Sequence, residues 1–391
     1  VICTDKTGTL TENRMLVERL WTPAGEYTVS GDGYSPDGSL EPAAAGDALA
    51  MRAAHVAAAC NDATLVPPDG GGEWAVTGDP TEGALVAFAA KLGVTQKDLA
   101  VYCPRVAEVA FDSERRRMTT VHEVRGAELQ IETPEWVAVK GAIESIAPLL
   151  AADQAGLLDE ARGAAERFAQ DGYRVLALAD AGISEVPAEP ADAEQGLQLV
   201  GVVAMADPPR EAAASAIEEC RSAGITPVMI TGDHQLTATS IAKRLGMLDD
   251  QRESVTGVEL AAISAEDFET KVTDIGVYAR TNPEQKLRIV DAWRQSGAVV
   301  AMTGDGVNDA PALRKADIGV AMGITGTDVS KEAADMILED DDFSTIVAAV
   351  EEGRRIYANI RRFVRYLLTT NSAEIWVMVL APFVGLPLPL L

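Results

Sequence analysis

Short apolar runs that end in polar loops recur along this chain. Four of them lie at residues 1–4, 200–206, 227–230 and 298–302. Helical apolar spacing follows most of these runs, at residues 211–222, 235–245 and 283–295. This alternation of buried strands and helices predicts an α/β fold with a doubly wound parallel sheet.

A second domain is predicted inside this fold. Residues 5–199 separate the first apolar run from the other three and contain hairpin-like runs at 106–111, 118–124 and 136–140. An insertion after the first strand is the simplest account of this spacing. The predicted limits are 1–20 and 201–350 for the sheet domain, 21–200 for the inserted α+β domain, and 351–391 for a C-terminal helix.

The C-terminal stretch is apolar. Residues 375–391 carry no charge, which predicts one membrane helix that Pro382 ends or kinks. An arginine-rich flank precedes it and is expected to face the cytosol, at Arg354, Arg355, Arg361, Arg362 and Arg365. A buried helix of a soluble domain is the alternative. No signal peptide opens the chain, and we expect its first residue to lie within a larger protein.

Charge and cysteine content narrow the functional classes. The 33 Lys+Arg against 60 Asp+Glu give a net charge of −27, which argues against nucleic acid as a partner. The four cysteines form no CxxC pair, so that neither a zinc site nor a disulfide framework is indicated. A cytosol-facing body with reduced thiols is expected.

The polar loops after the apolar runs carry the candidate chemistry. Asp5, the Thr231-Gly232-Asp233 loop and Asp305 each follow a predicted strand. The carboxyl ends of parallel strands meet at one edge of a sheet, where ligands bind. We therefore expect these groups to form a single site, whereas a capping role would be the ordinary explanation for any one of them alone.

The string Asp5-Lys6-Thr7-Gly8-Thr9-Leu10-Thr11 is the strongest signal. An aspartate at the end of a buried strand is suited to act as a nucleophile toward phosphate. The string resembles the phosphorylation signature of P-type ATPases, which implies a haloacid-dehalogenase-like fold and phosphorylation of Asp5 by ATP. Hydrolases of that superfamily carry a second aspartate where this chain has Thr7, and threonine is no general base near neutral pH.

The string 303–311 is the second signal, because its two acids, Asp305 and Asp309, are four residues apart at the start of a predicted helix. The resemblance implies that Mg²⁺ binds Asp5, Asp305 and the Thr7 carbonyl, since this ion takes oxygen ligands. It also assigns supporting or catalytic roles to a further set: Lys6, Thr231, Gly232, Asp233, Lys286, Asn308 and Asp309. Lys286 supplies a cation in this scheme, and 207–210 forms a hinge.

The insert contains no Gly-x4-Gly-Lys-Ser/Thr loop, so that ATP is not expected to bind as in P-loop proteins. The resemblance places ATP against residues that would otherwise be interpreted as core or surface groups: Glu82, Phe111, Arg116, Lys140, Gly141, Arg174 and Arg280. Related calcium pumps have an arginine where this chain has Ser113, so that one phosphate contact expected from the resemblance depends on replacement by a neighbouring arginine.

Asn371 and Glu374 lie three residues apart in the predicted membrane helix, where ionisable groups are usually functional. The resemblance implies that they bind the transported cation, with Ca²⁺ favoured and Na⁺, K⁺ or H⁺ as alternatives. We expect a multi-pass membrane ATPase that couples ATP hydrolysis to cation export, of which actuator and other membrane segments lie outside this sequence. A soluble phosphatase of the same superfamily and a non-catalytic nucleotide-binding module are the competing hypotheses.

Overall fold

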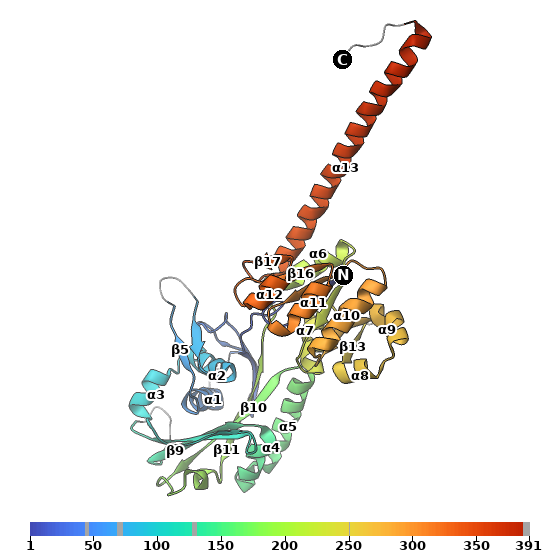
Figure 1. The fold of residues 1–391 in the computed structure, drawn as a ribbon. Helices are drawn as coiled ribbons and strands as arrows, with labels where there is room; N and C mark the ends of the chain where they lie inside the picture. The colour runs from blue at the N-terminus through green and yellow to red at the C-terminus, as the bar shows by residue number, and fades with distance from the viewer. Residues whose placement is uncertain (44–46, 69–72, 127–130, 250, 386–391) are drawn as a thin grey trace.

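The computed structural model describes residues 1–43, 47–68, 73–126, 131–249 and 251–385. Two large sheets with their helices, a separate two-stranded hairpin and one long C-terminal helix make up the described chain (Figure 1). The parallel sheet is built from the N-terminal strand and the C-terminal half of the chain. The segment between them forms the antiparallel sheet, so that the expected insertion is confirmed.

The parallel sheet has the strand order β13-β14-β12-β1-β15-β16-β17. Its strands are β1 (Ile2–Thr4), β12 (Pro227–Ile230), β13 (Glu253–Thr256), β14 (Ile275–Ala279), β15 (Ala301–Gly304), β16 (Ile318–Met322) and β17 (Met336–Leu338). Every pairing within it is parallel. β1 therefore lies at the centre, with its carboxyl end between those of β12 and β15.

Helices cover both faces of the parallel sheet, which confirms the doubly wound fold. On one face, α6 (Glu211–Ser222), α7 (Gln235–Arg244) and the first turn of α13 (Phe343–Leu380) share a core with the strands. The helices that pack on the other face are α8 (Gly257–Ala262), α9 (Ala265–Lys271), α10 (Pro283–Gln295), α11 (Ala310–Lys315) and α12 (Asp328–Ala333).

The antiparallel sheet has the order β4-β3-β2-β11-β10-β9-β8-β7. Its strands are β2 (Leu16–Thr22), β3 (Gly25–Val29), β4 (Leu40–Glu41), β7 (Arg105–Asp112), β8 (Arg117–Glu123), β9 (Glu135–Gly141), β10 (Arg174–Ile183) and β11 (Gln198–Ala206). The helices around it are α1 (Ala48–Ala59), α2 (Pro80–Lys91), α3 (Gln96–Tyr102), α4 (Ile143–Ile146) and α5 (Ala155–Gln170), and a separate hairpin pairs β5 (Thr64–Val66) with β6 (Ala75–Thr77). The three predicted hairpin runs correspond to β7, β8 and β9.

One strand prediction was wrong. The apolar run 200–206 belongs to β11, which pairs antiparallel with β10 and β2 instead of joining the parallel sheet. A strand buried on both faces has the same apolar pattern in either kind of sheet, so that the sequence could not distinguish them. The predicted domain limits at 20/21 and 200/201 fall inside β2 and β11, and the limits themselves stay a prediction.

The C-terminal helix α13 extends away from both sheets (Figure 1). With the following 3₁₀ turn η6 (Ala381–Val384) it forms one helical run of 42 residues, long and apolar enough to cross a membrane by length and composition. Phe343 and Ile346 in its first turn are buried under the parallel sheet, whereas most of its remaining side chains are exposed. α13 begins before the predicted boundary at residue 351, and it ends at Leu380, shortly before Pro382.

Candidate active site

Asp5 lies directly beyond the carboxyl end of the central strand β1. Its backbone N–H donates to Thr303 Oγ1 at 3.1 Å, which joins it to the end of the neighbouring strand β15. Its own carboxylate accepts the Lys6 N–H at 2.7 Å. The parallel register of β1 with β12 and β15 brings Asp5, Asp233 and Asp305 to the same edge of the sheet, as the sequence predicts.

Three carboxylates gather at this edge. One oxygen each of Asp5, Asp305 and Asp309 lies within 4.8 Å of the others. Asp309 is buried and accepts the Gly306 N–H at 3.1 Å. Burial raises the pKa of Asp5, and the pKa of Asp305 is raised by burial and then by the negative charges of Asp5 and Asp309. A cation at this point therefore stabilises the ionised cluster.

Lys286 supplies such a cation from the first turn of α10. Its Nζ lies 2.7 Å from Asp5 Oδ2 and 2.8 Å from Asp309 Oδ1. The helix start that positions it has a capping box between Asn282 and Gln285 with Pro283 at the first helical position. Burial lowers the pKa of Lys286, but the charges and hydrogen bonds of Asp5 and Asp309 raise it by more. The pKa of Lys286 is therefore higher than usual, and the ammonium stays charged.

The donor set suits a divalent cation with a preference for oxygen ligands, such as Mg²⁺. The cluster fits such a cation because three carboxylates converge on one point. Lys286 pairs with Asp5 and Asp309, whereas Asp305 has no lysine within ion-pair distance among the described pairs, so that its negative charge is available to a metal ion. The cluster includes Asp309, which the sequence places only in a supporting role. Thr7 lies in the turn after Asp5, and Asn308 is exposed in the 3₁₀ turn η5 (Val307–Asp309).

A second ion-pair chain holds the Thr231-Gly232-Asp233 loop. Lys6 is buried, and its Nζ lies 2.6 Å from Asp233 Oδ2 and 3.6 Å from Asp207 Oδ2. The Asp233 N–H donates to Thr231 Oγ1 at 3.1 Å and fixes the loop before α7. Lys6 thus joins the loop of Asp5 to that of Asp233.

Asp207 is a site residue that sequence reasoning treated only as part of a hinge. Its carboxylate accepts the Thr11 hydroxyl at 2.5 Å and the Arg14 N–H at 3.0 Å. Arg210 donates to the carbonyl of Gly8 at 3.0 Å, so that the return segment is bound to the signature loop. The Asp-Pro-Pro-Arg string at 207–210 indicates that this segment matters, but the sequence does not show that it contacts the loop after Asp5.

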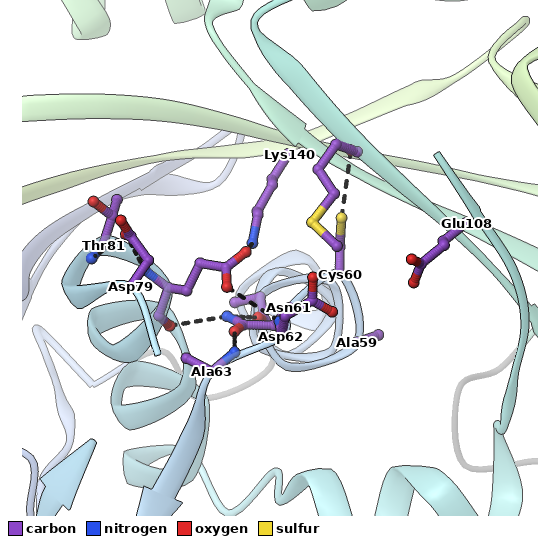
Figure 2. A network of polar contacts seen from close by, with 12 residues as sticks. Ala59, Cys60, Asn61, Asp62, Ala63, Asp79, Thr81, Glu108 and Lys140 are labelled. Carbon is purple, nitrogen blue, oxygen red and sulfur yellow. Dashed lines mark hydrogen bonds and ion pairs between the residues drawn. The ribbon is translucent and has the colours of Figure 1, made fainter. Parts of the chain in front are cut away.

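A buried ion pair marks the predicted nucleotide pocket. Lys140 Nζ at the end of β9 lies 2.6 Å from Glu82 Oε1 at the start of α2. Figure 2 shows Lys140 directed toward the turn that follows α1, where the Asp62 N–H donates to Glu82 Oε2 at 3.2 Å and Asn61 donates to the Glu82 carbonyl. The fold therefore brings Glu82 and Lys140 together from positions 58 residues apart in sequence.

The β7–β8 turn lies against the same end of β9 as Lys140. Arg116 has φ 55°, and its carbonyl accepts the Ala142 N–H at 3.0 Å. A Cβ at Gly141 would lie 2.6 Å from that oxygen, so glycine is needed for this approach. Phe111 at the end of β7 is 63% exposed, which leaves its ring accessible.

The neighbours of Arg116 are already paired. Arg115 and Arg117 both contact the buried carboxylate of Glu194, with Arg117 Nη2 at 2.7 Å. Thr119 also donates to Glu194 at 2.6 Å. Neither arginine is therefore free to replace the arginine expected at Ser113, and Glu194 is a residue that no sequence motif indicated.

The remaining two nucleotide candidates lie in different parts of the molecule. Arg174 is exposed at the first position of β10 in the antiparallel sheet. Arg280 follows β14 of the parallel sheet, and its N–H donates to the Asp233 carbonyl at 3.0 Å. Arg280 is thus placed beside the loop of Asp233 and not in the group around Lys140.

Known proteins match this chain along its whole length. A family model described as P-type ATPase, cytoplasmic domain N, matches residues 50–212. The "Probable cation-transporting ATPase F" of Mycobacterium tuberculosis is 47% identical over 413 aligned residues, which cover 100% of this chain and 44% of the relative. The "Calcium-transporting ATPase" of Bacillus subtilis is 41% identical and covers 100% of this chain and 45% of the relative.

The chain belongs to the P-type cation-transporting ATPases. It spans less than half the length of these relatives and corresponds to their cytoplasmic N and P domains with one apolar helix. In this P-type ATPase chain the antiparallel sheet is the N domain and the parallel sheet has the form of the P domain.

Asn371 and Glu374 lie on the outer part of α13 in this P-type ATPase chain. Both side chains are exposed, and a separation of three residues puts them on the same side of the helix. Their roles, like those of the other site residues, stay predictions.

Proposed function

We propose that this chain is the ATP-consuming part of a membrane cation pump, in which Asp5 receives the γ-phosphoryl group of ATP. The contact between Asp5 and Lys286 beside Asp305 and Asp309 carries this proposal. A carboxylate held at the end of a buried strand, next to a fixed cation, combines a nucleophile with charge compensation for phosphoryl transfer.

In the proposed reaction, an Asp5 carboxylate oxygen forms a bond to the γ-phosphorus while the bond to the β–γ bridging oxygen breaks. ADP leaves with that electron pair, and an aspartyl phosphate remains. Lys286 lowers the energy of the negative charge on the transferring group, and the loop 231–233 holds its oxygens with the Thr231 hydroxyl and backbone amides. Lys6 keeps this loop close to Asp5.

Mg²⁺ bound by Asp5, Asp305 and Asp309 would neutralise charge on the phosphate oxygens, with the Thr7 carbonyl and Asn308 as further proposed contacts. For ATP we propose the N domain, because Lys140 and Glu82 form a largely buried charged pair and the ring of Phe111 in the same sheet is exposed. Arg116 is the turn arginine that Glu194 leaves available for phosphate. Gly141, Arg174 and Arg280 complete the proposed set.

For the intact pump we propose a location in the cell membrane with these domains in the cytoplasm and the basic flank of α13 on the same side. Asn371 and Glu374 are proposed ligands of the transported cation. Calcium is favoured because the Bacillus subtilis relative is named a calcium-transporting ATPase, whereas the Mycobacterium tuberculosis relative is named only for cations. Other cations remain the alternative.

The test is incubation with γ-labelled ATP and Mg²⁺, followed by acid quench and hydroxylamine. We expect acid-stable, hydroxylamine-sensitive label that is lost in Asp5→Asn while ATP binding to the N domain is retained. Label that persists in Asp5→Asn would refute the assignment. Hydrolysis of small phosphoesters without ATP would favour the soluble phosphatase, against which Thr7 counts. In membranes with the complete pump, label that does not respond to Ca²⁺ would refute calcium.

A further inference from the structure

The backbone around Asp305 needs external support. Gly304 and Gly306 flank this residue, and glycine restricts backbone rotation less than any other residue. Two groups from another segment contact the Asp305 carbonyl: the Thr327 N–H at 2.8 Å and Ser330 Oγ at 3.0 Å. The position of this metal-site carboxylate therefore depends on the start of α12.

The start of α12 is in turn held by the preceding loop, residues 323–326. This loop is packed tightly against the sheet, since a Cβ at Gly323 would lie 2.4 Å from the Leu338 carbonyl and one at Gly326 would lie 2.0 Å from the Met322 carbonyl. Both glycines let the backbone pass where a side chain would not fit. Gly326 joins this loop directly to Thr327.

One carboxylate closes this loop. Asp341 Oδ1 accepts the N–H groups of Gly323 at 2.6 Å and Ile324 at 3.0 Å. Its Oδ2 accepts both the N–H and the hydroxyl of Thr325, each at 2.8 Å. Each carboxylate oxygen thus accepts two hydrogen bonds, and the donors come from three consecutive residues. Successive backbone N–H groups that converge on one carboxylate form an anion-binding nest.

Asp341 also stands at the base of the long helix. It is 2% exposed and adopts φ 52°, a left-handed conformation that aspartate adopts more readily than most residues other than glycine. The next residue, Asp342, is the N-cap of α13 and accepts the Ser344 N–H at 2.8 Å. Phe343 is buried directly after it. The carboxylate therefore lies between the support of Asp305 and the first turn of α13.

We propose that Asp341 is a positioning residue that fixes Asp305 for divalent-cation binding and couples the occupancy of that site to the first turn of α13. The proposal rests on the metal site of the proposed function. The path is short. Asp341 accepts hydrogen bonds from the loop 323–325, the chain continues from this loop through Gly326 to Thr327, and the Thr327 N–H and the Ser330 hydroxyl donate to the Asp305 carbonyl. Coupling of this kind acts in both directions.

The test is Asp341→Asn in the full chain. An amide has one acceptor oxygen, so that in either orientation its NH₂ group faces a backbone N–H of the loop 323–325. Both bonds from Gly323 and Ile324 are lost in one orientation, and the bond from the Thr325 N–H is lost in the other, where the Thr325 hydroxyl can still accept from the amide. Asp340→Asn is the matched control, because Asp340 is the exposed neighbour whose hydrogen bonds to described residues lie at the helix start, with the Asp342 N–H and the Thr345 hydroxyl. Thr325→Val removes one donor to Asp341 and is the milder variant.

The first readout is Mn²⁺ binding by paramagnetic resonance without ATP, with Mg²⁺ competition and with Asp305→Asn as the baseline for other acidic sites. We expect about 10-fold weaker binding in Asp341→Asn, the usual size of an effect on residues behind a metal ligand. Thr325→Val should weaken binding less, and Asp340→Asn should match the unchanged chain. If Asp341→Asn does not fold, Thr325→Val decides by the same comparison.

The second readout is hydrogen exchange of a peptide covering 342–350 at saturating Mg²⁺. The metal should slow exchange there in the unchanged chain and in Asp340→Asn, but not in Asp341→Asn. A lower melting temperature with unchanged Mn²⁺ affinity and unchanged protection would overturn the proposal, because Asp341 would then only stabilise the fold. Metal binding is measured without ATP, so a failure of Asp5 phosphorylation is seen separately.

Discussion

Removing the cation at the centre of the site tests the electrostatic account most directly. In Lys286→Met the apolar stem of the side chain is kept and the charge is lost. The Lys286 side chain is 10% exposed, and those of its partners Asp5 and Asp309 are 16% and 4% exposed. Breaking a buried ion pair by removing one partner costs about 3–5 kcal/mol, because the remaining charge is left uncompensated.

The pH dependence of this loss has a definite sign. Burial already raises the pKa of Asp5, and Lys286 opposes that rise. Without Lys286 the folded state binds more protons than the unfolded state above the ordinary carboxyl pKa, so that stability falls as pH rises. The loss should therefore be larger at pH 8 than at pH 5. Mg²⁺ should recover about 2.7 kcal/mol at 100 times its dissociation constant.

The assay is urea unfolding of the chain at pH 8 and pH 5, with and without Mg²⁺. Lys315→Met is the matched control. Lys315 pairs with Asp291 at 3.0 Å, but their side chains are 44% and 34% exposed. Such surface pairs contribute about 0–1 kcal/mol. A loss below about 1 kcal/mol in Lys286→Met at pH 8 without Mg²⁺, equal to that of the control, would refute the reasoning.

Two further predictions concern the N domain and its contact with the P domain. Burial lowers the pKa of His122 to about 4. Because the unfolded chain takes up a proton at a higher pH than the folded chain, the free energy of unfolding should fall by up to about 3 kcal/mol as pH drops from 6.5 to 4. In His122→Gln, urea titrations at each pH should show a smaller dependence of this free energy on pH. Gly172→Ala should cost about 2–4 kcal/mol, because φ is +86° and a Cβ would lie 2.9 Å from the Leu236 carbonyl on α7. Gly156→Ala, where no neighbour lies within 4 Å, should be neutral or stabilising in the same unfolding assay, and equal losses in the two variants would contradict the packing argument.

The strands that bring Asp5, Asp233 and Asp305 to one edge of the parallel sheet were predictable from local sequence. A Thr-Gly-Asp string follows the buried strand β12, and another begins within the last residues of β15, so that this pattern needs only a few consecutive residues. Asp5 has the same position after β1. Because parallel strands end at a common edge, their acids were expected together before any contact was known.

The residues that the sequence did not indicate act through distant contacts. Glu194 neutralises two arginines near position 116, and Asp341 binds the loop 323–325. Each is an acid in a chain with 60 acids, and neither lies in a recognisable string. The strand β11 was assigned to the wrong sheet for a related reason. Its own apolar residues do not specify its partners, and only the tertiary structure shows that it pairs with β2 and β10.

The sequence by itself determined the alternation of strands and helices around β1, β12 and β15, the signature loop of Asp5 and the family to which the chain is similar. These depend on apolar periodicity and on short strings, which are local properties. Only the tertiary structure decided which charges compensate each other: Lys286 reaches Asp5 across 281 residues, and Lys6 reaches Asp233 from the opposite loop. Such pairs form because burial penalises an isolated charge, and burial depends on the whole fold.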